Sequence, residues 1–266
     1  MFKWIRLLST CGPSVLKAYF SWIRKYAKHP EKYPLEVRYA AVRKLILFFM
    51  KHMRVDLDLV EDPAWKERES VSLIVSNHLS MMDVLMMIAV SEKPVSFVAK
   101  IETKKLPFVG KIIQSIDGVF LDRGNLRQNV IAMKTVEDRL KSGYCSYVIY
   151  PEGTRQKHPR ENMLPMHPGS FKTGVKAGVP LQPMAEYGTF RVFGSRHDYK
   201  ANPIALHFLK PVLPEDYKEI ATPDLAIKIQ DMIQKEVNVL RDKDDAYFLA
   251  NKHHQKIQPP YWWEHI

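Results

Sequence analysis

The chain has 266 residues, and its 46% hydrophobic content excludes an intrinsically disordered protein and is enough for a large core. Its two cysteines, Cys11 and Cys145, are far apart and form neither a disulfide framework nor a zinc-binding pattern. The net charge of +11 is concentrated in residues 1–54, which hold twelve Lys/Arg residues against two acidic ones. We therefore expect a basic arm over residues 1–54 and a nearly neutral domain over residues 55–266.

The first 28 residues predict an amphipathic helix. Basic side chains lie opposite an apolar stripe, which consists of Trp4, Leu7, Leu8, Cys11, Val15, Tyr19, Trp22 and Tyr26. Gly12-Pro13 should kink or break this helix, because proline lacks an amide hydrogen and clashes with the preceding turn. A second apolar stripe predicts a second helix, and it consists of Leu35, Tyr39, Val42, Ile46, Phe49 and Met53.

The two segments predict an N-terminal hairpin that attaches the protein to an anionic membrane surface. Apolar faces edged by Trp, Tyr, Lys and Arg are typical of helices that lie in the membrane interface. Nucleic acid is not the expected partner, because it would not require these apolar faces. Neither segment contains the roughly 18 uncharged apolar residues of a spanning helix, and neither resembles a secretory signal. The alternative is that both stripes pack on the body of this protein.

Strand and helix patterns alternate through the domain. Apolar and β-branched runs predict strands at residues 55–60, 70–76, 95–100, 118–122, 145–150, 179–187 and 204–212. Helices are expected at residues 84–90, 107–115, 125–141 and 223–241. This alternation predicts an α/β fold with a mixed, mostly parallel sheet flanked by helices.

Polar clusters follow three of the predicted strands. Asn77 and His78 come directly after one strand, and Asp83 opens the helix behind it. Arg123 follows a second strand, and the segment 152–155 follows a third. A histidine five residues before an aspartate occurs easily by chance, but ligands in α/β sheets bind beyond the carboxyl ends of strands. The three clusters together therefore predict one site.

Four blocks in order resemble the glycerolipid acyltransferases. They are NHLSMMD (77–83), GVFLDR (118–123), YPEGTR (150–155) and VPLQPM (179–184). The resemblance covers about residues 70–190, with Tyr150 where the family has phenylalanine and Met184 where valine is usual. Within the family, the blocks are most similar to members that acylate 1-acyl-sn-glycerol-3-phosphate and produce phosphatidic acid.

The resemblance implies acyl transfer from a thioester to a hydroxyl group, which needs a general base. His78 is expected to be that base, because a histidine side chain changes charge near neutral pH. Asp83 is expected to accept the other ring N–H and to stabilise the imidazolium. Ser80 is expected to cap the following helix, and Asn77 to order the loop by hydrogen bonds.

Recognition of the acceptor's phosphate requires cations and backbone N–H groups. Arg123 and Arg155 are expected to bind the phosphate, with Lys100 as a further cation. Gly153 permits a close backbone approach to the ligand. The two residues around it complete the expected substrate site: Glu152 orients an arginine or a glycerol hydroxyl, and Thr154 holds the turn.

The partners implied are a lysophosphatidic acid acceptor and a thioester donor, either acyl-CoA or acyl-acyl carrier protein. No metal or cofactor is expected. We expect the protein at the cell membrane, peripheral on its cytoplasmic face. Alternatives are an acyltransferase for another lysolipid or for glycerol-3-phosphate, and a non-catalytic basic membrane-binding protein. A serine hydrolase is disfavoured because the chain has no G-x-S-x-G motif.

Overall fold

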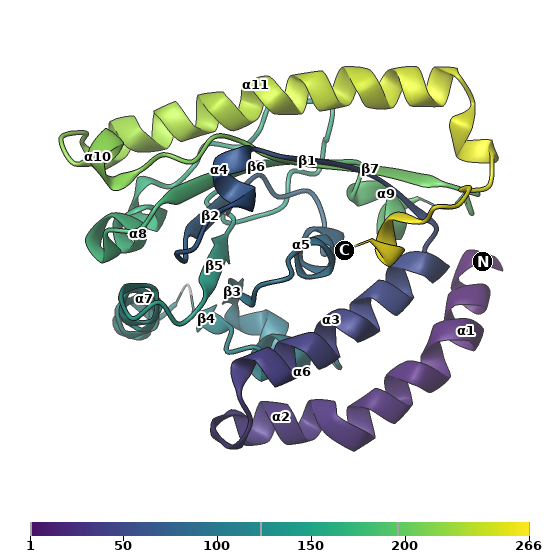
Figure 1. Cartoon of the computed structure of the whole chain (residues 1–266), viewed down its shortest axis with the longest axis horizontal. Coiled ribbons are helices and arrows are strands. Elements are labelled where there is room, and N and C mark those ends of the chain that lie inside the picture. The colour runs from purple at the N-terminus through teal and green to yellow at the C-terminus, as the bar shows by residue number, and fades with distance from the viewer. Residues whose placement is uncertain (1, 123, 196, 266) are drawn as a thin grey trace.

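The computed structural model describes residues 2–122, 124–195 and 197–265, and Figure 1 shows the sheet at the centre of the fold. Over these residues the sheet has seven strands in the order β1-β7-β6-β2-β5-β3-β4. The strands are β1 Val55–Glu61, β2 Leu73–Ser76, β3 Val95–Lys100, β4 Val119–Leu121, β5 Ser146–Ile149, β6 Leu181–Tyr187 and β7 Asn202–Phe208. Strands β6 and β7 pair antiparallel, and the other neighbours pair parallel. The predicted mixed, mostly parallel sheet is confirmed.

The register places two of the predicted polar clusters, those after β2 and β5, along one edge of the sheet. Strand β2 lies between β5 and β6, with Ile74 opposite Val148 on one side and Gln182 on the other. Because β2, β5, β3 and β4 run parallel, their carboxyl ends point the same way. All residues of β2, β5 and β6 are buried, which explains the apolar runs of β2 and β5 and means that Gln182 and Glu186 of β6 need partners inside the protein.

The helices flank the sheet on both sides. They are α1 Phe2–Ala18, α2 Arg24–Lys28, α3 Leu35–His52, α4 Pro63–Lys66, α5 Met82–Val90, α6 Val109–Ser115, α7 Leu126–Lys141, α8 Lys172–Ala177, α9 Phe190–Gly194, α10 Pro214–Tyr217 and α11 Thr222–Leu249. Figure 1 shows α11 along the top of the molecule and α1 on the opposite side. The helix predicted at residues 223–241 corresponds to α11, which extends eight residues further at its C-terminal end.

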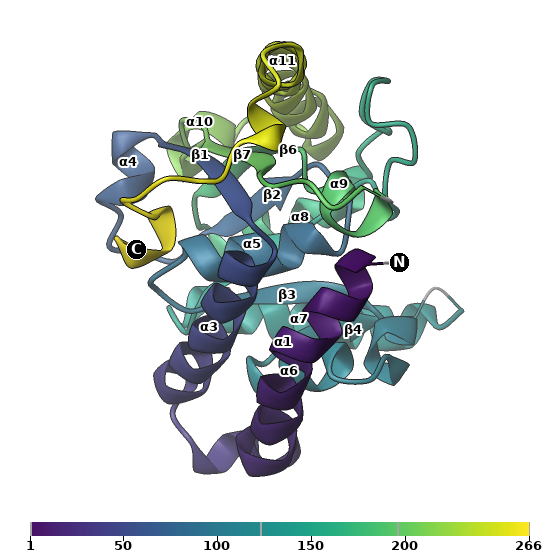
Figure 2. The same ribbon diagram turned by 90° about the vertical axis from the view of Figure 1, so that its right-hand side faces the viewer.

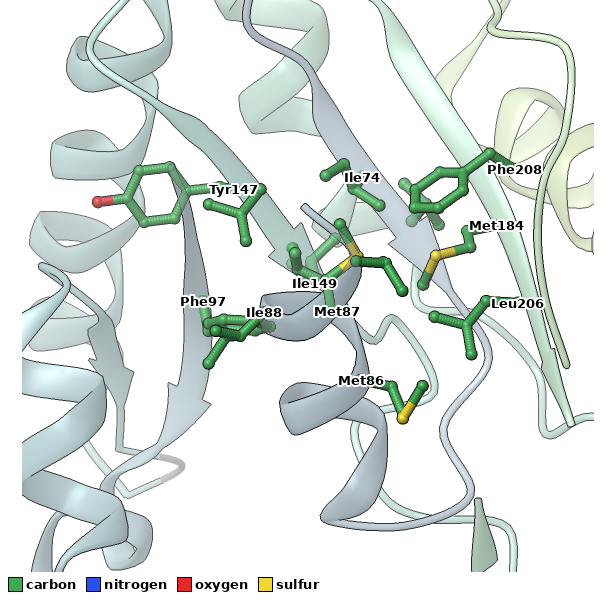
Figure 3. Packing of buried hydrophobic residues seen from close by; sticks show 14 of the residues in the cluster. Ile74, Met86, Met87, Ile88, Phe97, Tyr147, Ile149, Met184, Leu206 and Phe208 are labelled. Carbon is green, nitrogen blue, oxygen red and sulfur yellow. The ribbon is translucent and has the colours of Figure 1, made fainter. Parts of the chain in front are cut away.

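Helix α5 packs its apolar residues into the centre of the core. Met86, Met87 and Ile88 have no exposed surface and face side chains from β2, β5, β6 and β7 in Figure 3. Methionine fills irregular gaps because its side chain is unbranched and flexible. This close packing fixes the position of α5 and therefore of Asp83 in its first turn.

The second predicted stripe is part of the core. Tyr39, Val42 and Ile46 on α3 are at most 2% exposed, and the Tyr39 hydroxyl donates to the carbonyl oxygens of Ile88 and Ser91. Arg38, also buried, pairs with Asp117 at 2.7 Å. This stripe therefore packs on the body and does not face a membrane, so the alternative stated for it is correct.

The first stripe is divided between the body and the surface. In Figure 2, α1 and α3 run side by side, and Leu7 and Cys11 of α1 are buried against the body. Other apolar residues of α1 and of the π-helix Tyr19–Ile23 are exposed, namely Trp4, Ile5, Leu8, Leu16 and Phe20. We call these five residues the α1 outer face. Among the residues described, none of the helices combines the length and apolar character that a bilayer crossing requires.

The predicted break at Gly12-Pro13 is wrong, because α1 continues through Pro13 to Ala18. Pro13 is exposed, so water can hydrogen-bond the carbonyl group that proline leaves without a helical donor. The irregularity comes later, at the π-helix that joins α1 to α2.

Candidate active site

The loop after β2 wraps around the carboxylate of Asp83. One oxygen of Asp83, Oδ2, accepts hydrogen bonds from His78 Nδ1 at 2.7 Å, from Leu79 N at 2.7 Å and from Ser80 N at 2.9 Å. The Ser80 hydroxyl accepts from Met82 N at 3.1 Å at the start of α5. The five-position spacing of His78 and Asp83 therefore lets one turn of the chain direct three donors at a single buried carboxylate. The predicted pairing of His78 with Asp83 is present in the structure.

His78 is oriented for proton transfer through its second ring nitrogen. The Asp83 carboxylate makes Nδ1 the donor, which leaves a lone pair on Nε2. The side chain is 19% exposed, and no described residue hydrogen-bonds Nε2. The ring also stacks on Tyr150, with centroids 4.3 Å apart and planes 24° apart. His78 thus has a ring held by Asp83 and Tyr150, with one ring nitrogen that no described residue hydrogen-bonds.

Glu152 fastens the His78 loop to the segment after β5. Its Oε1 accepts from His78 N at 2.7 Å and its Oε2 from Leu164 N at 2.9 Å. Burial raises the pKa of this carboxyl, and the two backbone donors oppose that shift. The contact with an arginine or a glycerol hydroxyl that we expected of Glu152 stays a prediction.

Asn77 fastens the same loop to β6 on the other side. Its side-chain Nδ2 donates to the Glu186 carbonyl oxygen at 2.9 Å, and its Oδ1 accepts from Glu186 N at 2.8 Å. The expectation that Asn77 orders the loop by hydrogen bonds agrees with this geometry. His78 is therefore held between β5 and β6 by its neighbours in sequence and by Glu152.

A basic pocket of about 580 Å³ lies beside this loop. Its walls come from the loop, the segment after β5, and α9 with the residues that follow it; they are Leu79, Thr154, Arg155, Gln156, Lys157, Pro159, Phe190, Arg191, Gly194, Ser195 and Tyr199. Arg191 is buried and pairs with Asp244 at 2.6 Å, so its charge is balanced within the fold. Arg155 and Lys157 are exposed and make no ion pair with any residue the structure describes. The pocket therefore presents two available cations, and it meets the His78 loop at Leu79, although His78 itself is not among its lining residues.

Gly153 and Lys100 are not among the residues that line this pocket. Gly153 has φ of +66°, a backbone conformation that favours glycine, and it turns the chain between Glu152 and Thr154. Lys100 is exposed at the end of β3, where it pairs with Glu102 at 3.2 Å. Arg123 lies outside the described residues, so its predicted contact with phosphate stays a prediction.

Three residues at the site were missed by sequence reasoning. Lys157 lies two residues beyond YPEGTR, and Glu186 lies two residues beyond VPLQPM. Tyr150 was noted only as a replacement for phenylalanine. The available signal for Glu186 was a charged residue inside an apolar strand, which demands a buried partner.

Comparisons with known proteins point to one enzyme family. A family profile described as Acyltransferase matches residues 60–186. A probable 1-acyl-sn-glycerol-3-phosphate acyltransferase of Mycoplasma pneumoniae is 30% identical over 224 residues, which are 76% of this chain and 79% of the relative. A 1-acyl-sn-glycerol-3-phosphate acyltransferase of Helicobacter pylori is 29% identical over 62% of this chain and 67% of its own.

A solved structure shares the fold. The crystal structure of the 1-acyl-sn-glycerophosphate acyltransferase PlsC from Thermotoga maritima matches with a TM-score of 0.64 and 23% identity, covering 91% of this chain and 98% of that chain. The match extends beyond the four sequence blocks to nearly the whole fold. With the profile, the 30% identical relative and this fold in agreement, the chain belongs to the acyltransferase family.

Proposed function

We propose that the protein transfers an acyl group from a thioester to the sn-2 hydroxyl of 1-acyl-glycerol-3-phosphate, giving phosphatidic acid. The observation that carries the proposal is the His78–Asp83 pair beside a pocket with two available cations. The names of the relatives from Mycoplasma pneumoniae and Helicobacter pylori support this acceptor. Family membership and the paired His78 and Asp83 disfavour the non-catalytic alternative.

His78 is the general base in this proposal. Its Nε2 takes the proton of the acceptor hydroxyl while the oxygen attacks the thioester carbonyl carbon. The tetrahedral intermediate then expels the thiolate, and the imidazolium returns the proton to sulfur. Asp83 holds the ring and stabilises the imidazolium by its charge. No enzyme nucleophile is needed, because the hydroxyl of the acceptor itself attacks.

The acceptor's phosphate fits the basic pocket. Arg155 offers a planar guanidinium that can bind two phosphate oxygens at once, and Lys157 adds a second positive charge. Arg123 and Lys100 remain further candidates from the sequence. The thioester donor is acyl-CoA or acyl-acyl carrier protein, and the expectation that no metal or cofactor takes part stays a prediction.

The α1 outer face supports attachment to a membrane. Leu8 is 69% exposed and Phe20 67% exposed, and five exposed apolar residues grouped on one helical segment are typical of a surface that binds a membrane or a partner. Exposed Lys17 and Arg24 lie on the same helical segment, and their charges suit anionic lipid. Because acceptor and product are both lipids, we propose that the protein is peripheral on the cytoplasmic face of the cell membrane.

The decisive experiment is thioester consumption by purified protein with lysophosphatidic acid or lysophosphatidylcholine as acceptor. We expect turnover with lysophosphatidic acid and its loss in His78→Ala, with His254→Ala, an exposed histidine near the C-terminus, as the control. Turnover with lysophosphatidylcholine alone would replace the proposed acceptor. Full activity of a folded His78→Ala variant would overturn the role of the base.

A further inference from the structure

A second buried carboxyl is joined by hydrogen bonds to the residues that precede His78. Glu186 on β6 has no exposed surface, and Asp83 has none either. The two hydrogen bonds from Asn77 hold the backbone of Glu186 against the His78 loop. The mechanism above gives Glu186 no role, although a carboxyl without solvent needs a specific reason to be there.

The hydrogen bonds leave one oxygen unpartnered on each of these carboxyl groups. Glu186 Oε1 accepts from the Ser76 hydroxyl at 3.1 Å and from the Tyr150 hydroxyl at 3.5 Å. Asp83 uses only Oδ2, for its three donors. Among the described residues, neither Glu186 Oε2 nor Asp83 Oδ1 has a partner, and both atoms are buried. Such atoms are rare in proteins, because an unmade hydrogen bond in the interior is unfavourable.

The charges around Glu186 favour its protonated form. Its hydrogen-bond partners, Ser76 and Tyr150, are neutral hydroxyl donors. Burial and the charge of Asp83 raise the pKa of Glu186 well above its usual range. Burial likewise raises the pKa of the Tyr150 phenol, which therefore stays a neutral donor. Two carboxyl groups in one dry cluster do not both ionise, and Asp83 is the one that contacts the histidine.

We propose that Glu186 is a neutral carboxylic acid and a positioning residue, whose acid hydrogen supplies the donor that Asp83 Oδ1 lacks. The acid group touches no substrate. It fixes the Asp83 carboxylate from behind, so that Oδ2 stays on His78 Nδ1. It also limits the site to one negative charge, because a second would favour a histidine that is already protonated and unable to act as a base. The inference rests on the proposed role of His78 as the base.

Three variants separate this role from a structural one. Glu186→Gln keeps the size, the neutral charge and a donor, and we expect its kcat within about threefold of wild type with an unchanged pH profile. Glu186→Met keeps the volume but removes the donor, and we expect kcat to fall about tenfold or more with KM little changed. Gln182→Met, at another fully buried polar residue of β6 whose side-chain amide donates to the Pro183 carbonyl oxygen at 2.8 Å, is the matched control for loss of a buried donor.

Infrared spectroscopy tests the protonation without any turnover. At neutral pH, the wild-type spectrum minus the Glu186→Gln spectrum should contain the C=O band of a protonated carboxylic acid. Absence of that band overturns the inference, as does an inactive, folded Glu186→Gln variant or a Glu186→Met variant with wild-type kcat. Because the band needs no substrate, a protein that acylates no lysolipid would refute the proposed function and still report on Glu186.

Discussion

At the scale of the residue, Asp83 contacts both His78, the proposed base, and the backbone of the loop. Its Oδ2 fixes the His78 tautomer and also satisfies two backbone N–H groups of the loop. In Asp83→Asn, the amide oxygen can still accept hydrogen bonds from the loop backbone. The neutral amide, however, no longer stabilises a positively charged His78 ring. We expect kcat to fall by at least about 100-fold with KM little changed. Steady-state kinetics beside Asp231→Asn, an exposed control, check this, and a kcat near wild type would remove Asp83 from the mechanism.

Glu186 should also leave a signature in the pH dependence of stability. Its native pKa is raised by burial and Asp83, so the unfolded chain releases this proton at lower pH than the native chain does. Its contribution to stability is full below the ordinary glutamate pKa of about 4.3 and is lost as pH rises towards the native pKa.

Urea unfolding at several pH values measures this contribution. Above about pH 4.3, the free energy of unfolding of wild type should fall relative to Glu186→Gln, by up to about 1.4 kcal/mol per pH unit. The subtraction removes the groups that titrate in the same way in both proteins. Parallel curves for the two proteins would mean that Glu186 ionises normally in the native state.

Residues near in sequence were predictable, and residues brought together by the sheet were not. His78 and Asp83 are five positions apart, so a single local turn brings them together and the sequence alone can indicate the pair. Glu186 reaches the same cluster only because β6 lies beside β2, more than 100 residues away in the chain. Nothing local to Glu186 identifies that neighbour.

At the scale of the element, Glu152 connects the loop after β2 to the segment after β5, because it accepts hydrogen bonds from His78 N and Leu164 N. We call this pair of hydrogen bonds the Glu152 clamp. In Glu152→Gln, one amide oxygen remains for two backbone donors, and the amide nitrogen faces an N–H group. One buried donor is then unsatisfied, which costs about 1–3 kcal/mol. We expect a lower thermal unfolding midpoint, measured by circular dichroism. Exposed Glu219→Gln is the control, and an unchanged midpoint would contradict the clamp.

The elements themselves were mostly predictable, since each expected strand and helix has a counterpart within a few residues. Apolar periodicity gives the buried face of a helix only approximately. For this reason the stripe predicted on α1 does not match the residues that are buried there. The stripe chosen from periodicity contains both buried Leu7 and exposed Leu8, whereas exposed Ile5 and Leu16 lie outside it. A wide apolar sector with two different environments cannot be divided without knowing the neighbouring elements.

The α1 outer face should carry the attachment to membranes. We expect Leu8→Glu with Phe20→Glu to lower binding to anionic phospholipid vesicles by more than about tenfold, because each side chain loses roughly 1.5–3 kcal/mol of apolar transfer. Ile227→Glu on α11, on the opposite side of the molecule in Figure 1, is the matched control at 59% exposure. Cosedimentation measures the bound fraction. Equal binding of both variants would assign the attachment to another surface.

At the scale of the whole molecule, the order and direction of the strands could not be predicted from the sequence. The blocks predicted that polar clusters share an edge, but not that β1 and β7 extend the sheet beyond β6 or that β6 and β7 pair antiparallel. Those arrangements come from long-range packing. The same packing joins the N-terminal helices to the body, because Leu7, Tyr39 and Ile46 belong to one apolar cluster with the residues of the sheet.

This shared core makes the arm inseparable from the fold. Deleting residues 1–54 removes the buried face of α3 and leaves α5 and Asp117 without Tyr39 and Arg38. An exposed apolar surface of that size and an unpaired buried carboxylate are both strongly destabilising. We expect the truncated chain to lose its cooperative thermal transition, whereas the variant with Leu8→Glu and Phe20→Glu keeps it. A truncated protein that unfolds at the wild-type midpoint would show instead that residues 55–266 form an independent domain.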